Sequence, residues 1–424
     1  MSDNAFLDGR RLSARDVIQA FLDEGHDAGV SQLRILLRDG CGDEVDELAG
    51  DALLAWPPRA RNLIDKLLCV VSEAALARLA ARTVDVLEQA PPPDMRELCD
   101  LIIEAASLQI GPALQAQLGR LFALAPNRGH TCEDWPWRAA QAEDVAFLAD
   151  QLVTQDPKQR RKAFDCLLET RRPDALALAI DAYPTMALPY PLPQLLRSVD
   201  HDGPGQPLYP GNCAHLIFPP DYIEEGSADP APGAQHPSWT LPGDGALHRF
   251  GGVGSGTCGL CAGRLHHLVT LPEHAIFGMH GADASALSLE VCLSCLGWER
   301  GMLFYRHDHN GLAHALDHGA VIPQFPANPL APTEVRLAPT PARWTWQSWG
   351  GGNLHRVGGP PVWIQHADYP DCPACARTMR FAMQLNSYLP TTDETEWWLW
   401  GSGGIGYVFQ CHPCRTIGYF WQCT

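Results

Sequence analysis

Cys258-Gly-Leu-Cys261 is the first of four Cys-x-x-Cys segments in the chain, and it is followed by Cys292-Leu-Ser-Cys295, Cys372-Pro-Ala-Cys375 and Cys411-His-Pro-Cys414. Two thiolates that are separated by two residues in a tight turn can face the same metal ion. Two such turns together supply the four sulfurs of a closed tetrahedral site, which is typical of structural zinc. The sequence therefore predicts two structural zinc ions, each held by four of these eight cysteines.

Alternative interpretations of the cysteines are buried free thiols and disulfides. The chain starts with Met1-Ser-Asp-Asn and lacks a basic segment followed by an apolar one, so neither export nor disulfides are expected. His412 lies inside the last segment and Cys423 lies near it, and each is an alternative metal ligand. We expect Cys411 and Cys414 to fill these positions.

Length and charge restrict the class of protein. A chain of 424 residues has room for two or three domains. It contains no uninterrupted apolar run long enough to span a membrane, so we expect a cytosolic protein with reduced thiols. The formal net charge of −18 argues against a nucleic-acid partner, because phosphates would be repelled. The excess acid serves either solubility or the binding of a basic protein.

The composition changes near residue 200. Only two of the 17 histidines and three of the 13 tryptophans precede this point, and no lysine follows it. Upstream, apolar residues recur at helical spacing between prolines and glycines, which predicts short helices. After a first helix near Leu12, the expected helices cover residues 29–38, 43–55, 59–70, 72–89, 94–108, 111–124, 142–154, 158–170 and 173–182.

The second half of the chain has the features of a duplication. His248-Arg249-Phe250-Gly251-Gly252 is echoed by His355-Arg356-Val357-Gly358-Gly359. In each copy a Cys-x-x-Cys segment, a strand-like run, a second Cys-x-x-Cys segment and an aromatic strand follow in the same order. Two related β modules, each tied by one zinc ion, account for this order.

These features predict an α+β protein. An all-helical domain at residues 1–183, either HEAT-like or an irregular bundle, is expected to precede a proline-rich linker at 184–206. A duplicated β-rich zinc-binding domain follows, with its first module at 207–329 and its second at 330–424.

The second copy resembles a known family. The residues that carry the resemblance are Gly358-Gly-Pro-Pro-Val-Trp-Ile364, Cys372-Pro-x-Cys375, Met379-x-Phe-x-x-Gln-Leu385, Tyr407-x-Phe-x-Cys-x-x-Cys414 and Trp421-Gln422. They are similar to the YwqG-like domain of bacteria and to its eukaryotic relative, programmed cell death protein 2. The resemblance covers about residues 207–424, although the first copy lacks the Pro-x-Trp that follows the glycine pair. It implies a duplicated β-rich fold and a function in protein binding, as an immunity protein against a toxin or as a chaperone of a ribosomal protein.

Catalytic motifs are weak. Gly254-x-Gly256-x-x-Gly259 and Gly401-x-Gly403-x-x-Gly406 match the dinucleotide fingerprint formally, but each continues into a Cys-x-x-Cys segment or a strand where a helix must begin. Four thiolates per ion also leave no coordination position for water. His307-Asp308-His309, with His314 and His318 at helical spacing, is either an additional metal or acid–base site or a polar loop.

Two groups of residues are candidates for a protein interface. The first is an acidic cluster, which is either a solvated helix face or a docking surface for a basic protein. The second is a tryptophan group beside a glycine-rich run, which either fills the core or anchors a partner. The candidate residues are Asp43, Glu44, Asp46 and Glu47 in the cluster and Trp397, Trp398 and Trp400 in the group.

The sequence predicts a cytosolic zinc protein that binds another protein and is not an enzyme. Its expected role is that of an immunity protein, which would cover a basic toxin such as a nuclease encoded nearby. One alternative is a chaperone for a basic, ribosomal-type client. The other is a metal-dependent enzyme that uses the region from His307 to His318.

Overall fold

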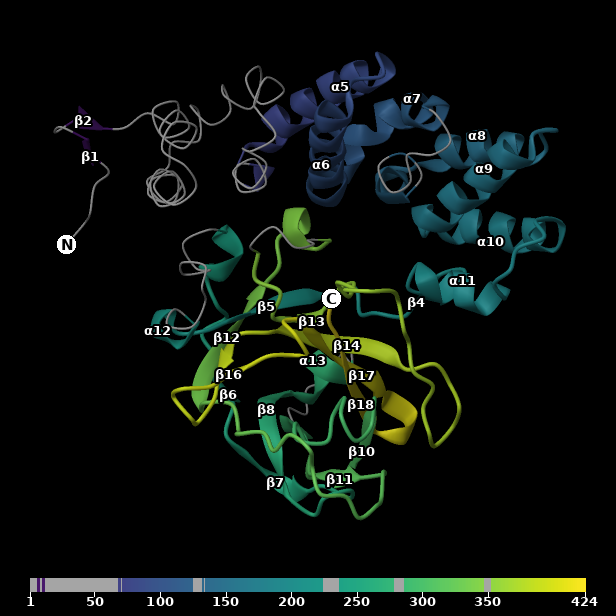
Figure 1. Ribbon diagram of the computed structural model, residues 1–424. Coiled ribbons are helices and arrows are strands. Elements are labelled where there is room, and N and C mark those ends of the chain that lie inside the picture. Colours follow the sequence, from purple (N-terminus) through teal and green to yellow (C-terminus); the bar gives the residue numbers. More distant parts are fainter. Residues whose placement is uncertain are drawn as a thin grey trace.

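The computed structural model describes residues 68–424, apart from residue 70 and the segments 125–131, 133, 224–235, 278–285 and 347–351. It also describes two short strands near the N-terminus, Phe6–Leu7 (β1) and Arg10–Arg11 (β2) (Figure 1). Several predictions lie outside the described residues: the first helix from Leu12 onward, the helices expected at 29–38 and 43–55, most of that at 59–70, and the acidic cluster Asp43, Glu44, Asp46 and Glu47.

The first half of the described chain is helical, as the sequence predicts. Ser72 accepts a hydrogen bond from the Ala75 backbone at 3.1 Å and caps the first of these helices. Prolines at the start of several others suit a position whose N–H would be unpaired in any case. The helices are α5 (Glu73–Glu88), α6 (Pro93–Ile110), α7 (Leu118–Ala123), α8 (Ala142–Leu152), α9 (Pro157–Thr170) and α10 (Pro173–Ala182), with 3-10 helices η3 (Gly111–Gln117) and η5 (Trp135–Ala139).

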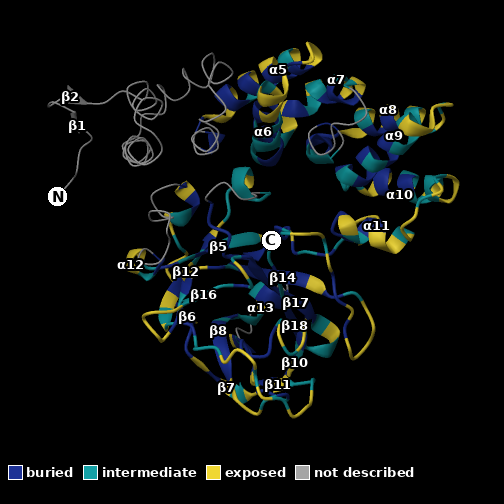
Figure 2. Cartoon of the chain, in the orientation of Figure 1, coloured by how far each residue is buried: buried dark blue, intermediate teal, exposed yellow. Residues whose placement is uncertain are grey.

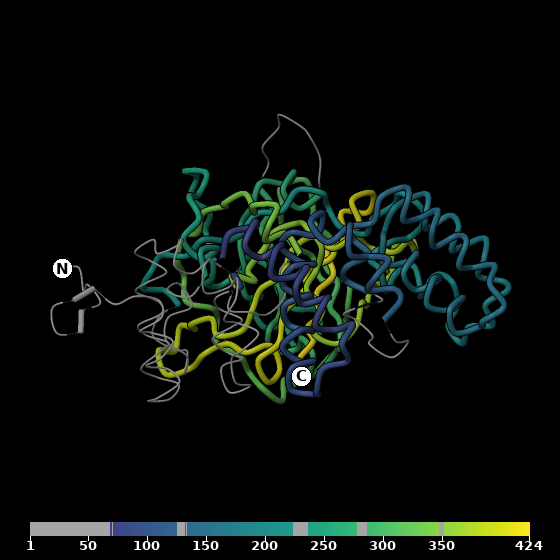
Figure 3. The backbone as a smooth tube through the Cα atoms, turned by 90° about the horizontal axis from the view of Figure 1, so that it is seen from above, coloured from purple at the N-terminus to yellow at the C-terminus, as the bar shows by residue number. Residues whose placement is uncertain are grey.

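The helices bury two separate apolar cores. Leu76 of α5 and Ile102 of α6 belong to the first, and Phe164 of α9 and Leu176 of α10 belong to the second. Buried residues line the inner faces of the helices, while exposed ones face outward (Figure 2). Figures 1 and 3 show this row of helices crossing one end of the sheet and extending beyond it. Sequential pairs of packed helices agree with the expected helical hairpins.

The segment expected to be a proline-rich linker has structure of its own. It contains helix α11 (Leu192–Ser198) and the start of a hairpin formed by β3 (His201–Gly203) and β4 (Gln206–Pro207). Leu195 and Leu196 of α11 are part of the second helical core. Pro191, whose fixed backbone precedes the helix, starts α11 instead of interrupting structure. The helical region therefore continues through residues 192–198.

The second half forms one antiparallel twelve-stranded sheet that curves into a near-barrel. The hydrogen-bonded order is β11-β10-β18-β17-β14-β13-β5-β12-β6-β8-β7, and β9 pairs with β8. The strands are β5 (Cys213–Ile217), β6 (His248–Phe250), β7 (Val253–Thr257), β8 (Arg264–Pro272), β9 (Ala286–Val291), β10 (Leu303–His307), β11 (Ala313–Ala315), β12 (Thr333–Pro339), β13 (Arg356–Gly358), β14 (Arg380–Asn386), β17 (Ile405–Cys411) and β18 (Thr416–Gln422).

Shorter elements accompany the large sheet. Helix α13 (Glu273–Phe277) packs against strands of both halves, among them β8 and β14, and buries Ile276 and Phe277. The other elements are helix α12 (Pro220–Ile223), the 3-10 helices η6 (Tyr183–Thr185), η8 (Pro237–Trp239), η9 (Ala342–Trp344) and η10 (His412–Cys414), and a hairpin of β15 (Leu389–Pro390) and β16 (Trp397–Trp398).

The two copies of the duplication exchange strands. Strand β5 precedes the His-Arg-x-Gly-Gly motif of the first copy but pairs with β13 of the second, and β12 precedes that motif of the second copy but pairs with β6 of the first. Strands β5 and β12 also pair with each other, and β10 pairs with β18. The expected modules at 207–329 and 330–424 are therefore distinct along the sequence but share a single sheet in space.

The repeated glycine pair explains part of the duplication. Gly251 and Gly358 adopt φ angles of +72° and +68°, which favour glycine. A Cβ atom at Gly251 would collide with the backbone oxygen of Ala331, and one at Gly358 would collide with that of Asn212. Both contacted residues lie just before the exchanged strands, so the glycines allow the same close approach in both copies.

In the part of the chain that the structure describes, no helix is both long enough and apolar enough to cross a membrane.

Candidate metal centres

The four Cys-x-x-Cys segments come together in two clusters of four. Cys258 and Cys261 meet Cys292 and Cys295, and the second cluster consists of Cys372, Cys375, Cys411 and Cys414. In each cluster all four Sγ atoms lie within 4.8 Å of one another. The prediction of two four-cysteine clusters is confirmed, and each cluster joins the segments of one copy.

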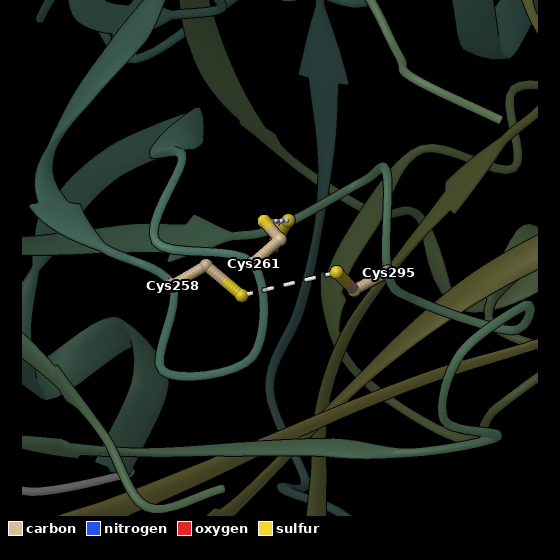
Figure 4. Close-up of side chains that lie close together, drawn as sticks. Cys258, Cys261 and Cys295 are labelled. Atoms are coloured by element: carbon tan, nitrogen blue, oxygen red, sulfur yellow. Dashed lines mark hydrogen bonds between the residues drawn. The ribbon is translucent and has the colours of Figure 1, made fainter. Parts of the chain in front are cut away.

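The sulfur spacing fits a tetrahedral metal site. The Sγ atoms of Cys258 and Cys295 are 3.9 Å apart, and those of Cys261 and Cys292 are 3.7 Å apart. Figure 4 shows Cys258 and Cys295 pointing toward one another from neighbouring loops. Four sulfurs at about 2.3 Å from a central zinc ion would be about 3.8 Å from each other. A disulfide would need about 2.05 Å, so these thiols are not cross-linked.

Backbone geometry fixes the first segment of each cluster in the same turn. The N–H of Ala262 donates to the carbonyl of Cys258 at 3.0 Å, and the N–H of Ala376 donates to that of Cys372 at 2.8 Å. Ala262 and Ala376 have φ angles of +58° and +56°. Such left-handed residues close a tight turn, which keeps both sulfurs of the segment on one side.

The first cluster is set into the core of the near-barrel. Cys258, Cys292 and Cys295 are buried, and all belong to the core that also contains Tyr305. The Tyr305 hydroxyl accepts a hydrogen bond from the backbone N–H of Cys292 at 3.2 Å, and His266 Nδ1 accepts one from Leu293 at 3.1 Å. Because these partners lie on β10 and β8, the cluster connects strands from different parts of the sheet.

The second cluster is more open. Cys372 is buried, Cys414 is partly buried and Cys375 is exposed, while the Sγ atoms of Cys375 and Cys411 are 3.7 Å apart. It joins the loop before β14 to the turn between β17 and β18, whose last residue, Arg415, has φ of +48°. Solvent therefore reaches this cluster through Cys375.

The thiols have unequal acidities. A hydrogen bond from Cys292 lowers the pKa of Cys258 to about 5, whereas the pKa of Cys292 is raised because it gives its hydrogen to Cys258 and because it is buried. In the second cluster the backbone N–H of Arg377 lowers the pKa of Cys375 to about 7, and burial raises that of Cys411. Metal binding would release protons from the thiols whose pKa is raised, such as Cys292 and Cys411.

The alternative ligands lie outside both clusters. The ring of His412 packs edge-on against Phe277 with a centroid distance of 5.4 Å. The backbone oxygen of Cys423 accepts a hydrogen bond from Gln365 at 2.7 Å, and its sulfur does not belong to either four-cysteine group. The ligand sets are therefore made of the eight cysteines in the Cys-x-x-Cys segments.

The histidine-rich region does not form a compact site among the described residues. His307 is buried in β10, where Nε2 contacts the carbonyl oxygen of Ser288 at 2.9 Å. His314 lies in strand β11, not in a helix, and pairs with Asp308 at 3.2 Å on the surface. His318 lies in the loop beyond that strand and belongs to none of the possible metal groups in the described chain.

The tryptophan group is largely internal. Trp400 is only 2% exposed and donates from Nε1 to the Asn386 carbonyl at 3.2 Å, so this residue is a core residue and not a surface anchor. Trp397 and Trp398 form the short strand β16 and are half-buried. Trp398 packs edge-on against Trp400 at 5.4 Å.

Sequence reasoning missed a cluster of arginines between the helices and the sheet. Arg138 of η5, Arg171 after α9 and Arg356 of β13 line one cavity there. The outermost of these positions, 138 and 356, are 218 residues apart in the chain, and Arg138 and Arg171 lie in no recognisable motif. The only signal was the second copy of the His-Arg-x-Gly-Gly sequence, which does not reveal that Arg356 is buried.

Comparisons with known proteins give little more. No family model matches the chain, and no solved structure matches it. The uncharacterized protein YpfL of Salmonella typhimurium is 42% identical over 69 residues. This match covers 16% of the chain and only 15% of the length of YpfL. It assigns no family, and the resemblance to YwqG-like domains stays a prediction.

Proposed function

We propose that this chain is a zinc-containing protein that binds another protein, and that it acts as an immunity protein by covering a basic toxin. Each cysteine cluster would hold one zinc ion as a closed structural site, because four thiolates fill its tetrahedral coordination. The ions would then stiffen the loops of the sheet and leave binding to its surface.

The observation that carries this proposal is an exposed aromatic pair beside the first cluster. Trp298 lies three residues after Cys295, is 48% exposed, and its ring centroid is 4.7 Å from that of Phe325. Phe325 is itself 49% exposed. Tryptophans that are held in place but accessible are frequent anchors of protein interfaces.

Metal binding would hold this aromatic pair in position. The N–H of Glu299, next to Trp298, donates to the carbonyl of Cys295 at 3.0 Å, and the Glu299 carboxylate accepts from Gln324 at 2.8 Å. The loop that carries Trp298 is thus fastened to the cluster on one side and to the Phe325 segment on the other. With a net charge of −18, the chain would attract a basic partner.

The test combines binding and protection. Cells expressing the product of the adjacent gene should survive when they also express this chain, and the two proteins should copurify. Trp298→Ser should weaken binding by at least about tenfold, which is the usual cost of losing an interface anchor. The matched control is Tyr190→Ser, because Tyr190 is an aromatic residue of the helical region that is 51% exposed. The proposal is refuted if the wild-type chain neither copurifies with that gene product nor protects the cells.

A further inference from the structure

A cavity of about 380 Å³ lies between the helical region and the sheet. Its wall is built by α6, η5, α9 and α11 on one side and by β13 with the following loop, which includes Pro360 and Trp363, on the other. This volume is in the range of small-molecule sites, which often lie where two structural units meet.

Arg356 is a buried cation that forms no ion pair with the residues that the structure describes. The residue is 0% exposed, and its guanidinium donates only to the carbonyl oxygens of Thr345 at 2.8 Å, Pro360 at 3.2 Å and Trp344 at 3.4 Å. Its Nε has no hydrogen-bond partner, and none of the described carboxylates forms an ion pair with it. Burial lowers the pKa of this guanidinium, since the charged form is poorly solvated. An unpaired buried charge of this kind is costly to retain.

Two more arginines face the same cavity across Trp346. The guanidinium carbons of Arg138 and Arg171 are 4.6 and 4.7 Å from the centre of the Trp346 ring. Arg171 is neutralised by Asp200 at 2.6 Å. Arg138 is paired less closely: its Nε lies 3.7 Å from Oε2 of Glu169, and neither of these two atoms has a hydrogen-bond partner.

Four carboxylates, those of Glu104, Asp134, Glu169 and Asp200, line the cavity beside the three arginines, but none of them forms an ion pair with Arg356. Asp200 is fully occupied, since it also accepts hydrogen bonds from Trp363 at 2.8 Å and from Tyr369 at 2.9 Å. Glu169 is buried between Arg138 and Arg171, and burial raises its pKa. Arg356 thus stays without an ion pair among the described residues, although this protein has 18 more acidic than basic residues.

We propose that the cavity binds one small oxyanion, a carboxylate or a phosphate monoester, through the guanidinium of Arg356. A bound oxyanion would pair with the buried charge and supply an acceptor for its Nε. The rings of Trp346 and Trp363 offer an apolar wall for the remainder of the ligand. Glu104 and Asp134 also line the cavity, which disfavours polyanions such as nucleoside triphosphates. This inference does not depend on the proposed binding of a protein partner.

The experiment is calorimetric titration of the full-length protein in a low-chloride buffer with acetate, succinate or inorganic phosphate. We expect saturable binding of at least one of these probes at one site per chain, and the three titrations distinguish carboxylate from phosphate. Arg356→Met should weaken binding by at least about tenfold, because a hydrogen bond between charged groups is lost. Arg249→Met is the matched control, since Arg249 is the exposed counterpart of Arg356 in the first copy.

A second variant covers the case in which Arg356→Met does not fold. Ala367 is a half-buried loop residue of the cavity wall, so Ala367→Phe fills the cavity without removing a buried polar group. It should abolish binding while the zinc content and circular dichroism stay those of the wild type. The inference is overturned if none of the three probes binds saturably to the wild type, or if Ala367→Phe binds them as the wild type does.

Discussion

The Sγ atom of Cys375 lies 3.7 Å from that of Cys411, although 35 residues separate them along the chain. Cys261 and Cys292 have the same Sγ separation of 3.7 Å in the other cluster. Two copies with different sequences thus arrive at the same sulfur geometry. A tetrahedral ion in each cluster would account for this agreement, because packing alone does not impose one sulfur spacing.

Loss of a cysteine should remove one metal ion and destabilise the sheet to different extents in the two clusters. Cys292→Ser should lower the free energy of unfolding by at least about 3 kcal/mol, because it opens a cluster in the core. Cys375→Ser should cost less, because Cys375 is exposed. Elemental analysis should give two zinc ions per wild-type chain and one in each variant.

Cys423→Ser is the control for this series, since Cys423 belongs to neither cluster. It should keep two zinc ions and wild-type stability. A folded wild-type protein without metal would contradict the interpretation of the clusters.

Gly358→Ala should lower the free energy of unfolding by about 3 kcal/mol or more. The φ angle of +68° strains any L side chain, and the new Cβ would collide with the backbone oxygen of Asn212. Gly211→Ala is the matched control, because a Cβ there meets no atom within 4 Å. Urea denaturation of both variants measures the difference. Equal midpoints would show that β5 and β13 do not require this close approach.

Acid should destabilise the protein through His355. Burial lowers the pKa of His355 from its ordinary 6.5 to about 3, so the folded protein holds this ring neutral. Its stabilising effect is complete above pH 6.5 and is lost as the pH falls toward 3, because the unfolded chain binds the proton first. Between pH 7 and pH 5 this loss amounts to about 2 kcal/mol.

The variant His355→Gln should be less stable than the wild type at pH 7, since the packed ring is removed, but this deficit should shrink by about 2 kcal/mol at pH 5. Chemical denaturation at both pH values measures it. The buried neighbour Leu354 provides the control, Leu354→Ala, whose deficit should not change with pH because its side chain does not titrate. A deficit of His355→Gln that is independent of pH would show that the ring is protonated in the folded protein.

Asp200 should contribute strongly to the free energy that holds the helical region against the sheet. Its carboxylate pairs with Arg171 and accepts hydrogen bonds from Trp363 and Tyr369, which lie in the loop between β13 and β14. Asp200→Asn should cost about 3 kcal/mol, because it leaves Arg171 buried without its anion. Asp174→Asn, which breaks the exposed pair with Arg172, should cost less than about 1 kcal/mol. Thermal unfolding with equal losses for both variants would contradict this ranking.

The sequence was most informative for structures that depend on residues close together in the chain. Two cysteines separated by two residues predict a turn with converging sulfurs, and the two clusters contain those eight residues. Helical periodicity between residues 72 and 182 likewise predicts helices close to α5 through α10. Both patterns arise within a few residues, so local spacing was enough to predict them.

Longer-range features could not be predicted in the same way. Arg249 and Arg356 hold equivalent places in the repeated motif, yet Arg249 is exposed and Arg356 is fully buried. The helical region packs on the second copy, as the hydrogen bond of 2.7 Å between Arg343 and Gln109 of α6 illustrates, and Arg356 lines the cavity between the two. The pairing of β5 with β13 could not be predicted either, because no local pattern specifies that His215 pairs with Arg356, 141 residues later.

The exchange of β5 and β12 between the copies bears on how the protein is made. During synthesis β6 emerges with β8 but without β12, and β5 emerges without either of its partners, because β12 and β13 are translated later. Unpaired strand edges of this kind invite association with other nascent chains. Biogenesis should therefore depend on chaperone protection until the final hundred residues emerge, and a gene split between the copies should yield two insoluble products that become soluble only when coexpressed.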